Sequence, residues 1–243
     1  MADLSALWER LHREYATDRQ RPPREGTPPR GSVLVLAPHP DDETFGLGGT
    51  LALHARQGDR VEVLYLTDGG HGDPDGHWSR AELVALRQQE AQAAVAILGG
   101  QVAGFWEYPD SYPTVSQEAL DDLSGRLAAF VDDRAPATVY FPWPGESHQD
   151  HWAAGIATVR AARRLRGARP RLRAYEVWSP FLADEVIDVS GVYDVKLRAA
   201  AAYQSQLRYK DYFPIIQGLN AYRALFLRGG GKYAEAFLET GAP

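Results

Sequence analysis

The sequence predicts an α/β fold, a three-layer, Rossmann-like domain in which a mostly parallel sheet lies between helices on both of its faces. Short apolar runs typical of buried strands alternate along the chain with longer stretches typical of helices. The strand-like runs are residues 33–36, 61–67, 105–108, 137–141 and 173–178. The helix-like stretches are residues 50–57, 81–98, 116–133 and 152–165. Because strands and helices alternate, we expect right-handed crossovers between parallel strands.

Start and stop residues set the bounds of these elements. Gly58 and Gly99 each follow a helical stretch, at a position where glycine commonly ends a helix. Ser116 suits the N-cap of the third helical stretch, because its hydroxyl oxygen can accept a backbone N–H of the first turn. Beyond residue 178 the pattern predicts a further strand, a helix and a closing segment.

Residues 1–31 are predicted to form an N-terminal helix and a proline-rich arm, outside a domain that covers residues 32–243. Apolar residues recur at helical spacing between residues 4 and 15. Residues 19–31 hold four prolines, which is typical of a linker or a wrapping arm. We expect this leader to pack on the domain or on a neighbouring subunit, so it is a candidate contact in a homo-oligomer.

The composition is that of a soluble globular protein, with 44% apolar and 24% charged residues. No apolar run approaches the ~18 residues of a membrane-spanning helix, and the N-terminus lacks the apolar core of a secretory signal. We therefore expect a cytoplasmic protein without a membrane span. The net charge of −6, without a long basic run, argues against nucleic acid as a partner. Since the chain has no cysteine, any bound metal must be held by nitrogen and oxygen atoms.

The residues that follow the first strand-like run carry the first sign of a metal site. Pro40 suits the first position of a helix, and Asp41 and Asp42 would lie in its first turn, where negative charge is favoured. His39 and Asp42 are three residues apart, so they point the same way in a helical turn. One imidazole and two carboxylates at the carboxyl end of a strand favour a metal site, although aspartates also occur there as simple caps.

A second cluster, Glu146 to His151, follows the strand-like run 137–141. His148 and His151 repeat the three-residue spacing. Two such clusters at two strand ends fall on the same rim of a parallel sheet, where open α/β folds bind ligands. By chemistry alone the ligands could be His39, Asp42 and either His148 or His151.

Together these motifs resemble the PIG-L/LmbE-like metal-dependent deacetylases, which remove acetyl groups from amines of the N-acetylglucosamine type. The sequences HPDDE (39–43) and HQDH (148–151) carry the resemblance, and LTDG (66–69) and RQQE (87–90) support it. It runs from about Ser32 to the carboxyl terminus and implies one divalent metal, zinc first and Fe(II) as the alternative. The implied partner is a small N-acetylated sugar or glycoconjugate, and an amidase acting on a larger sugar conjugate is a close variant.

The resemblance also implies roles for the residues of the two clusters. The metal ligands would be His39, Asp42 and His151. Asp41 would be the general base that takes a proton from the attacking water. His148 would stabilise the oxyanion of the tetrahedral intermediate, where charge appears only in the transition state.

Three further residues have expected roles outside the metal ligands and the two catalytic groups. Asp150 is expected to orient one of the two histidines of its cluster, and the alternative is a simple helix-start charge. Arg87 matches a helix arginine that faces the substrate sugar in the family, and the alternative is an ion pair with Glu90 or another carboxylate. Asp110 matches a residue that binds sugar hydroxyls, and the alternative is a turn-forming aspartate.

Two other functions compete with deacetylation. A non-haem iron oxygenase could use His39, Asp41 and a distant histidine as a facial triad. That chemistry commonly occurs in jelly rolls, whose many short alternating strands are absent from the pattern. A non-catalytic sugar or nucleotide binder that uses a helix N-terminus for anions is disfavoured, because two aspartates would repel an anion unless a cation were bound.

Overall fold

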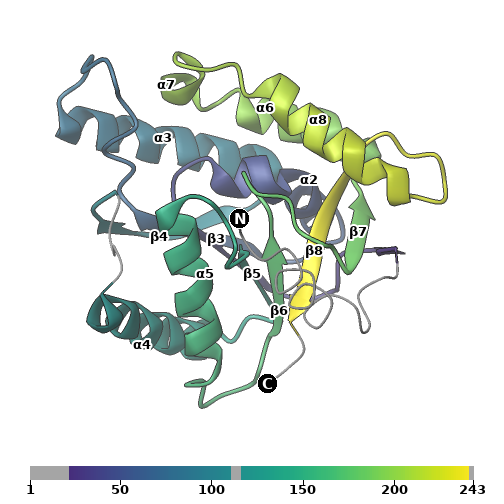
Figure 1. Ribbon diagram of the computed structural model, residues 1–243, viewed down its shortest axis with the longest axis horizontal. Helices are drawn as coiled ribbons and strands as arrows, with labels where there is room; N and C mark the ends of the chain where they lie inside the picture. Colours follow the sequence, from purple (N-terminus) through teal and green to yellow (C-terminus); the bar gives the residue numbers. More distant parts are fainter. Residues whose placement is uncertain (1–21, 111–115, 241–243) are drawn as a thin grey trace, which may run out of the picture.

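The computed structural model describes residues 22–110 and 116–240, and Figure 1 shows their arrangement around one sheet. The sheet has eight strands in the order β1-β7-β8-β6-β5-β2-β3-β4. The strands are β1 (Arg24–Gly26), β2 (Val33–Ala37), β3 (Val61–Thr67), β4 (Gln101–Tyr108), β5 (Thr138–Pro142), β6 (Arg171–Tyr175), β7 (Glu185–Asp188) and β8 (Ala234–Thr240). Strand β8 is antiparallel to β6 and β7, whereas the other neighbouring strands pair in parallel.

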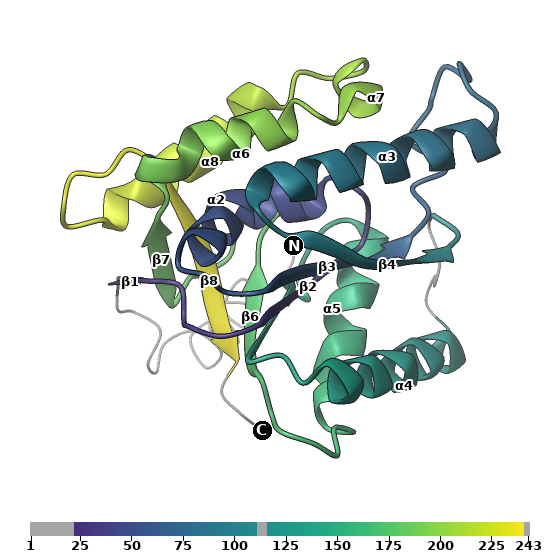
Figure 2. The same cartoon turned by 180° about the vertical axis from the view of Figure 1, so that it is seen from behind.

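Helices cover both faces of the sheet, which confirms the predicted three-layer α/β architecture. One face carries α2 (Asp42–Arg56), α3 (Arg80–Leu98), α6 (Tyr193–Ala200) and α8 (Phe213–Arg223), and the other carries α4 (Gln117–Arg134) and α5 (Gln149–Ala162). The view from behind in Figure 2 shows the same two layers. The remaining short helices are η1 (Ser190–Val192), α7 (Gln204–Leu207) and η2 (Ala224–Phe226).

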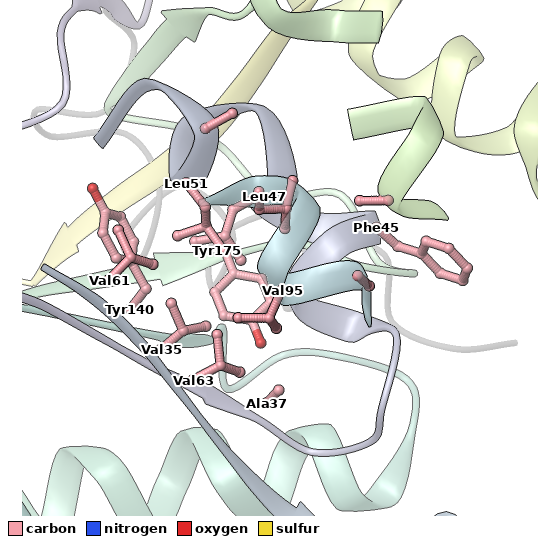
Figure 3. Close-up of a cluster of buried hydrophobic side chains, with 14 of the residues drawn as sticks. Val35, Ala37, Phe45, Leu47, Leu51, Val61, Val63, Val95, Tyr140 and Tyr175 are labelled. Carbon is pink, nitrogen blue, oxygen red and sulfur yellow. The ribbon is translucent and has the colours of Figure 1, made fainter. Parts of the chain in front are cut away.

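The alternation of side chains along β2 explains the two layers. Val33, Val35 and Ala37 face the core under α2 and α3, whereas Leu34 and Leu36 face the core under α4 and α5. Every residue of β2 is buried, as expected for a parallel strand covered on both faces. Figure 3 shows the first core, with side chains of the strands packed beneath those of α2.

Several predicted bounds agree with the structure. Strand β3 covers residues 61–67 as expected, and α3 ends at Gly99, whose φ of 84° is left-handed. Ser116 accepts the backbone N–H of Ala119 and thereby caps α4. Helix α3 begins with a capping box between Ser79 and Glu82.

Other elements differ from the sequence prediction. Strand β4 begins at Gln101 rather than at residue 105, because a half-exposed edge strand does not need a continuous apolar run. Helix α5 begins at Gln149 rather than at residue 152, since the His148 side chain accepts the backbone N–H of Asp150. Strand β6 covers residues 171–175 rather than 173–178.

Helix α2 is bent, and β8 supports it at the bend. The backbone at Leu47 leaves helical geometry, with φ −143° and ψ 20°. The Glu235 carboxylate of β8 accepts the N–H groups of Gly49 (2.9 Å) and Thr50 (2.7 Å), which begin the second part of the helix. Lys196 of α6 completes this buried group, with Nζ 2.6 Å from Glu235 Oε1. The group supports α2, which has Asp41 at its N-cap and Asp42 in its first turn.

Part of the predicted N-terminal arm belongs to the sheet. Strand β1 lies within residues 1–31 and pairs in parallel with β7. The predicted helix over residues 4–15 lies outside the described residues, and the division at residues 31 and 32 stays a prediction. Among the helices that the structure describes, none is both long enough and apolar enough to cross a membrane.

Candidate metal centre

The two histidine clusters meet because the strands before them are neighbours. Strands β2 and β5 pair in parallel, so their carboxyl ends lie at the same edge of the sheet. Residues 39–42 follow β2, and residues 146–151 follow β5. Asp110 reaches the same edge from the end of β4. The sheet topology therefore brings together residues that are far apart in the sequence.

Three ligand atoms of His39, Asp42 and His151 form a small triangle. Oδ2 of Asp42 lies 3.1 Å from His39 Nδ1 and 3.1 Å from His151 Nε2. The two ring nitrogens are 3.3 Å apart. Ligand atoms at 2.0–2.1 Å from a tetrahedral zinc ion lie roughly 3.3 Å from one another. The triangle therefore has the dimensions of three sites of a tetrahedral metal centre.

His148 stands beside this triangle rather than in it. Ligand atoms of His39, His148 and His151 all lie within 4.8 Å of one another, so distance alone would allow either histidine of the second cluster. His151 is fully buried, whereas His148 is exposed and its Nδ1 accepts the N–H of Asp150. Partial loss of hydration and the nearby His39 and His151 lower the pKa of His148, which favours the neutral imidazole.

Two carboxylates hold the far side of the His39 ring. Nε2 of His39 lies 2.8 Å from Asp110 Oδ1 and 3.0 Å from Asp150 Oδ2. Asp150 thus reaches the histidine of the first cluster, whereas a contact with a histidine of its own cluster was expected. Burial lowers the pKa of His39, but the hydrogen bonds to Asp110, Asp150 and Asp42 outweigh it and raise this pKa well above its ordinary value. Metal-ligating histidines usually have such carboxylates behind them, and these orient the ring.

Asp41 is buried in an unusual backbone conformation beside Arg87. Its φ is 134°, in a region that residues with a Cβ atom rarely adopt. Its Oδ2 lies 3.1 Å from Arg87 Nη2. Burial raises the pKa of Asp41 well above its ordinary value, and the Arg87 charge acts in the opposite direction. The predicted alternative to a sugar contact, an ion pair of Arg87 with Glu90 or another carboxylate, does form, and its carboxylate is that of Asp41. Glu90 instead accepts the N–H and the hydroxyl of Ser205.

The oxygenase triad proposed from the sequence is wrong in its carboxylate. Asp42, and not Asp41, faces both His39 and His151. The physical reason is the strained turn at Asp41, which directs its side chain to Arg87.

A cavity of about 300 Å³ opens onto these residues. It is lined by His39, Asp41, Asp42, His71, Gly72, Arg87, Asp110, His148, Trp178, Gln206 and Tyr212. Trp178, Gln206 and Tyr212 were not predicted, since they follow β6 or lie around α7, where no motif marks them. The predicted sugar-binding residues Arg87 and Asp110 both line the cavity, and their contact with a sugar stays a prediction.

Glu146 is a further residue of the site to which the sequence assigned no role. Its buried carboxylate accepts the backbone N–H groups of Val177 (2.7 Å), Trp178 (3.1 Å) and Ser179 (3.1 Å). Its Oε2 also lies 3.9 Å from Nδ1 of His151, a buried ring nitrogen without a hydrogen-bond partner among the described residues. The only sequence signal was its place five residues before His151 in the second cluster.

A mostly parallel α/β sheet with two histidines and an aspartate converging at one rim places the chain among open α/β proteins with a candidate metal site at the carboxyl ends of their strands. The chain belongs to the family described as PIG-L: GlcNAc-PI de-N-acetylase, which matches residues 34–162. This confirms the resemblance seen in the sequence.

Individual relatives support the assignment. The chain is 30% identical over 189 residues to the diacetylchitobiose deacetylase of Thermococcus kodakarensis, covering 72% of this chain and 69% of the relative. It is 28% identical over 209 residues to the 4-oxalmesaconate hydratase of Pseudomonas putida, covering 79% and 81%. The solved N,N'-diacetylchitobiose deacetylase of Pyrococcus horikoshii shares the fold, with a TM-score of 0.76, 22% identity, and coverage of 100% of this chain and 94% of that one.

Proposed function

We propose that this protein is a metal-dependent N-deacetylase that hydrolyses the N-acetyl group of an amino sugar of the N-acetylglucosamine type or of its glycoconjugate. The observation that carries the proposal is the triangle of His39, Asp42 and His151 beside the buried carboxyl group of Asp41. Family membership supports the reaction class. The products would be acetate and a free amine.

The donor set suits zinc, with Fe(II) as the alternative. Two imidazole nitrogens and one carboxylate oxygen are ligands that both ions accept. His39, Asp42 and His151 would hold the ion, while Asp110 and Asp150 keep the His39 ring oriented. When bound, the ion would lower the pKa of water and polarise the acetyl carbonyl group.

Residues of the chain itself would accept and donate the protons of the reaction. Asp41 would take a proton from the attacking water as the water oxygen bonds to the acetyl carbon. Its raised pKa, caused first by burial, suits a group that accepts a proton near neutral pH. His148, exposed at the cavity, would donate a hydrogen bond to the carbonyl oxygen as that atom gains negative charge. The proton held by Asp41 then passes to the nitrogen as the C–N bond breaks, which leaves acetate and amine.

The walls of the cavity suit a sugar ring. Trp178 and Tyr212 would offer aromatic faces to the apolar side of a pyranose. Arg87 and Asp110, expected from the family resemblance to contact the sugar, lie on the same walls. The N-acetylated sugar would thus enter with its acetamido group toward His39 and Asp42.

A second candidate is hydration of an unsaturated acid, because one relative is named as a hydratase. The cavity carries the carboxyl groups of Asp41, Asp42 and Asp110, and Arg87 is the one guanidinium group among its lining residues. This balance of charge suits a neutral sugar better than a polyanionic substrate, because like charges repel.

Acetate release tests the proposal directly. The purified protein, loaded with zinc, would be incubated with N-acetylglucosamine, N,N'-diacetylchitobiose and larger N-acylated sugar conjugates, each with and without a chelator. We expect acetate and free amine from at least one sugar, and loss of both products with the chelator. If the protein loaded with either zinc or Fe(II) releases no acid from any of these compounds, the proposed function is wrong. Preference for the larger conjugates would identify the amidase variant.

A further inference from the structure

The backbone at Asp41 is held in a conformation that needs support from its surroundings. Its φ of 134° and ψ of −28° place this residue outside the regions that residues with a side chain prefer. Such strain persists only where neighbouring groups hold the backbone in place, and it concentrates at functional sites. The residues that contact Asp41 and its preceding peptide are therefore of interest.

Arg87 makes two of these contacts from α3, while the Asp41 carbonyl accepts the N–H groups of Thr44 and Phe45 in the first turn of α2. Its Nη2 donates to the backbone oxygen of Pro40 at 2.6 Å and to Asp41 Oδ2 at 3.1 Å. Nη1 donates to the backbone oxygen of Gly69 at 2.9 Å. One planar guanidinium group thus donates hydrogen bonds to the Pro40 carbonyl, to the Asp41 side chain and to the loop after β3. The backbone N–H of Asp41 is held separately by Glu43 Oε2, at 3.3 Å.

The loop after β3 packs closely over the guanidinium. A Cβ atom at Gly69 would lie 2.6 Å from Arg87 Nη1, and one at Gly72 would lie 2.8 Å from it. Gly69 also has a φ of +63°, which favours glycine. Arg87 is only 3% exposed, so loop backbone covers the group that would have to reach a sugar.

We infer that Arg87 is a positioning residue that holds Asp41 in its strained conformation and aims its carboxyl group into the cavity. Both hydrogens of Nη2 are already engaged by Pro40 and Asp41, so a sugar hydroxyl that approached Nη2 would have to displace one of them. The inference rests on the proposed function, in which Asp41 is the general base. It assigns to Arg87 a different role from the sugar contact expected from the sequence.

The two roles differ in what a substitution changes. Loss of a sugar contact that is equal in the ground and transition states raises KM and leaves kcat unchanged. Loss of the group that positions a general base lowers kcat, on the order of 10²-fold for a displacement of about 1 Å, and changes KM little. The fall in kcat should also be the same for a monosaccharide and a disaccharide, because Asp41 is the general base for both.

The test compares Arg87→Ala and Arg87→Lys with the wild type, using N-acetylglucosamine and N,N'-diacetylchitobiose. We expect Arg87→Ala to lower kcat for both substrates on the order of 10²-fold. Arg87→Lys should recover only part of the loss, because an ammonium group cannot reach all three acceptors in one plane. Added guanidinium ion should partly restore Arg87→Ala. The matched control is Arg80→Ala, which removes the exposed arginine paired with Asp68 at the start of the same helix and should leave kcat unchanged.

A double-mutant cycle and a crystal structure complete the test. If Arg87 acts through Asp41, adding Arg87→Ala to the Asp41→Asn variant should lower kcat little further than Asp41→Asn alone. In crystals of Arg87→Ala, we expect the φ of Asp41 to differ from 134° or its carboxyl group to be displaced. If the alanine variant does not fold, crystals of Arg87→Lys serve the same purpose. An unchanged Asp41, or a raised KM at constant kcat, would overturn the inference. If the wild type releases no acetate, only the proposed function is wrong. The crystal structure of the Arg87 variant still tests whether Arg87 positions Asp41.

Discussion

His39 and His151 stand 112 positions apart in the sequence, yet Nδ1 of the first lies 3.3 Å from Nε2 of the second. Each histidine belongs to a helix start that follows one of two neighbouring parallel strands, β2 and β5. With Asp42 between them, the two rings direct nitrogen atoms at one point. The site thus depends on the pairing of β2 with β5 as much as on the motifs themselves.

The role of Asp41 predicts a specific loss on substitution. Asp41→Asn keeps the size of the side chain but removes the group that accepts a proton. We expect kcat to fall about 10²–10⁴-fold, as for other general bases, while zinc content stays at one ion per chain. Steady-state kinetics and metal analysis of the same preparation would measure both. Full activity in this variant would show that another group is the base.

Substitution of the two histidines of the second cluster should have different effects on the metal content. His151→Ala removes a corner of the triangle, so we expect bound zinc to fall well below one ion per chain after dialysis. His148→Ala should keep its zinc and lose activity, because His148 stands beside the triangle and lines the cavity. Plasma emission spectrometry of dialysed protein gives both numbers. The reverse pattern would exchange the roles of the two histidines.

Glu146 is expected to support metal binding through His151. The Glu146 carboxylate accepts several backbone N–H groups, so the amide N–H₂ of Glu146→Gln would face one of these donors. The substitution would also remove the acceptor oxygen that faces His151 Nδ1. We expect zinc affinity to fall about 10–100-fold, the usual cost of losing a carboxylate behind a ligand. Competition with a chromophoric chelator measures this.

The matched control for Glu146 is Trp143→Phe. It removes the 2.8 Å hydrogen bond from Trp143 Nε1 to the Ser179 carbonyl, and so loosens the same segment without touching His151. Zinc affinity should stay at the wild-type value in this control. Equal losses in both variants would mean that Glu146 acts only by holding residues 177–179.

Metal binding should release a proton from His39. Burial lowers the pKa of His39, but its bonds to Asp110, Asp150 and Asp42 raise it well above 6.5, so the metal-free ring holds a proton at neutral pH. A metal must displace that proton from Nδ1, and affinity should therefore weaken about tenfold for each pH unit below the raised pKa. Calorimetry in two buffers of different ionisation enthalpy counts the proton. Zinc binding without proton release near pH 7 would contradict the expectation.

The buried pair Lys196–Glu235 should matter for stability. Both side chains are fully buried, so Lys196→Met leaves the Glu235 charge without its cation, and we expect the free energy of unfolding to fall by about 3–5 kcal/mol. Arg198→Ala, which breaks an exposed pair with Asp194 on the same helix, should cost no more than about 0.5 kcal/mol. Urea unfolding followed by circular dichroism compares them. Similar small losses in both variants would show that the buried pair contributes little.

Local patterns predicted most of the elements that carry the site. The apolar runs identified β2, β3 and β5, because a strand covered on both faces must be apolar throughout. Strand β8 was missed, since AEAFLET contains helix-forming residues and a buried glutamate that no local rule explains. Its place between β6 and β7 depends on antiparallel pairing with distant partners.

The sequence by itself determined the kinds of ligand atom, the spacing within each cluster and the strands that precede them. Only the tertiary structure showed that one oxygen of Asp42 lies equally close to both histidines, that Arg87 contacts Asp41, and that Glu146 faces His151. The physical reason is that periodicity along a chain reports the direction of a side chain relative to its own helix or strand. Which distant side chains meet depends on strand order and on the strained turn at Asp41, and neither leaves a local pattern.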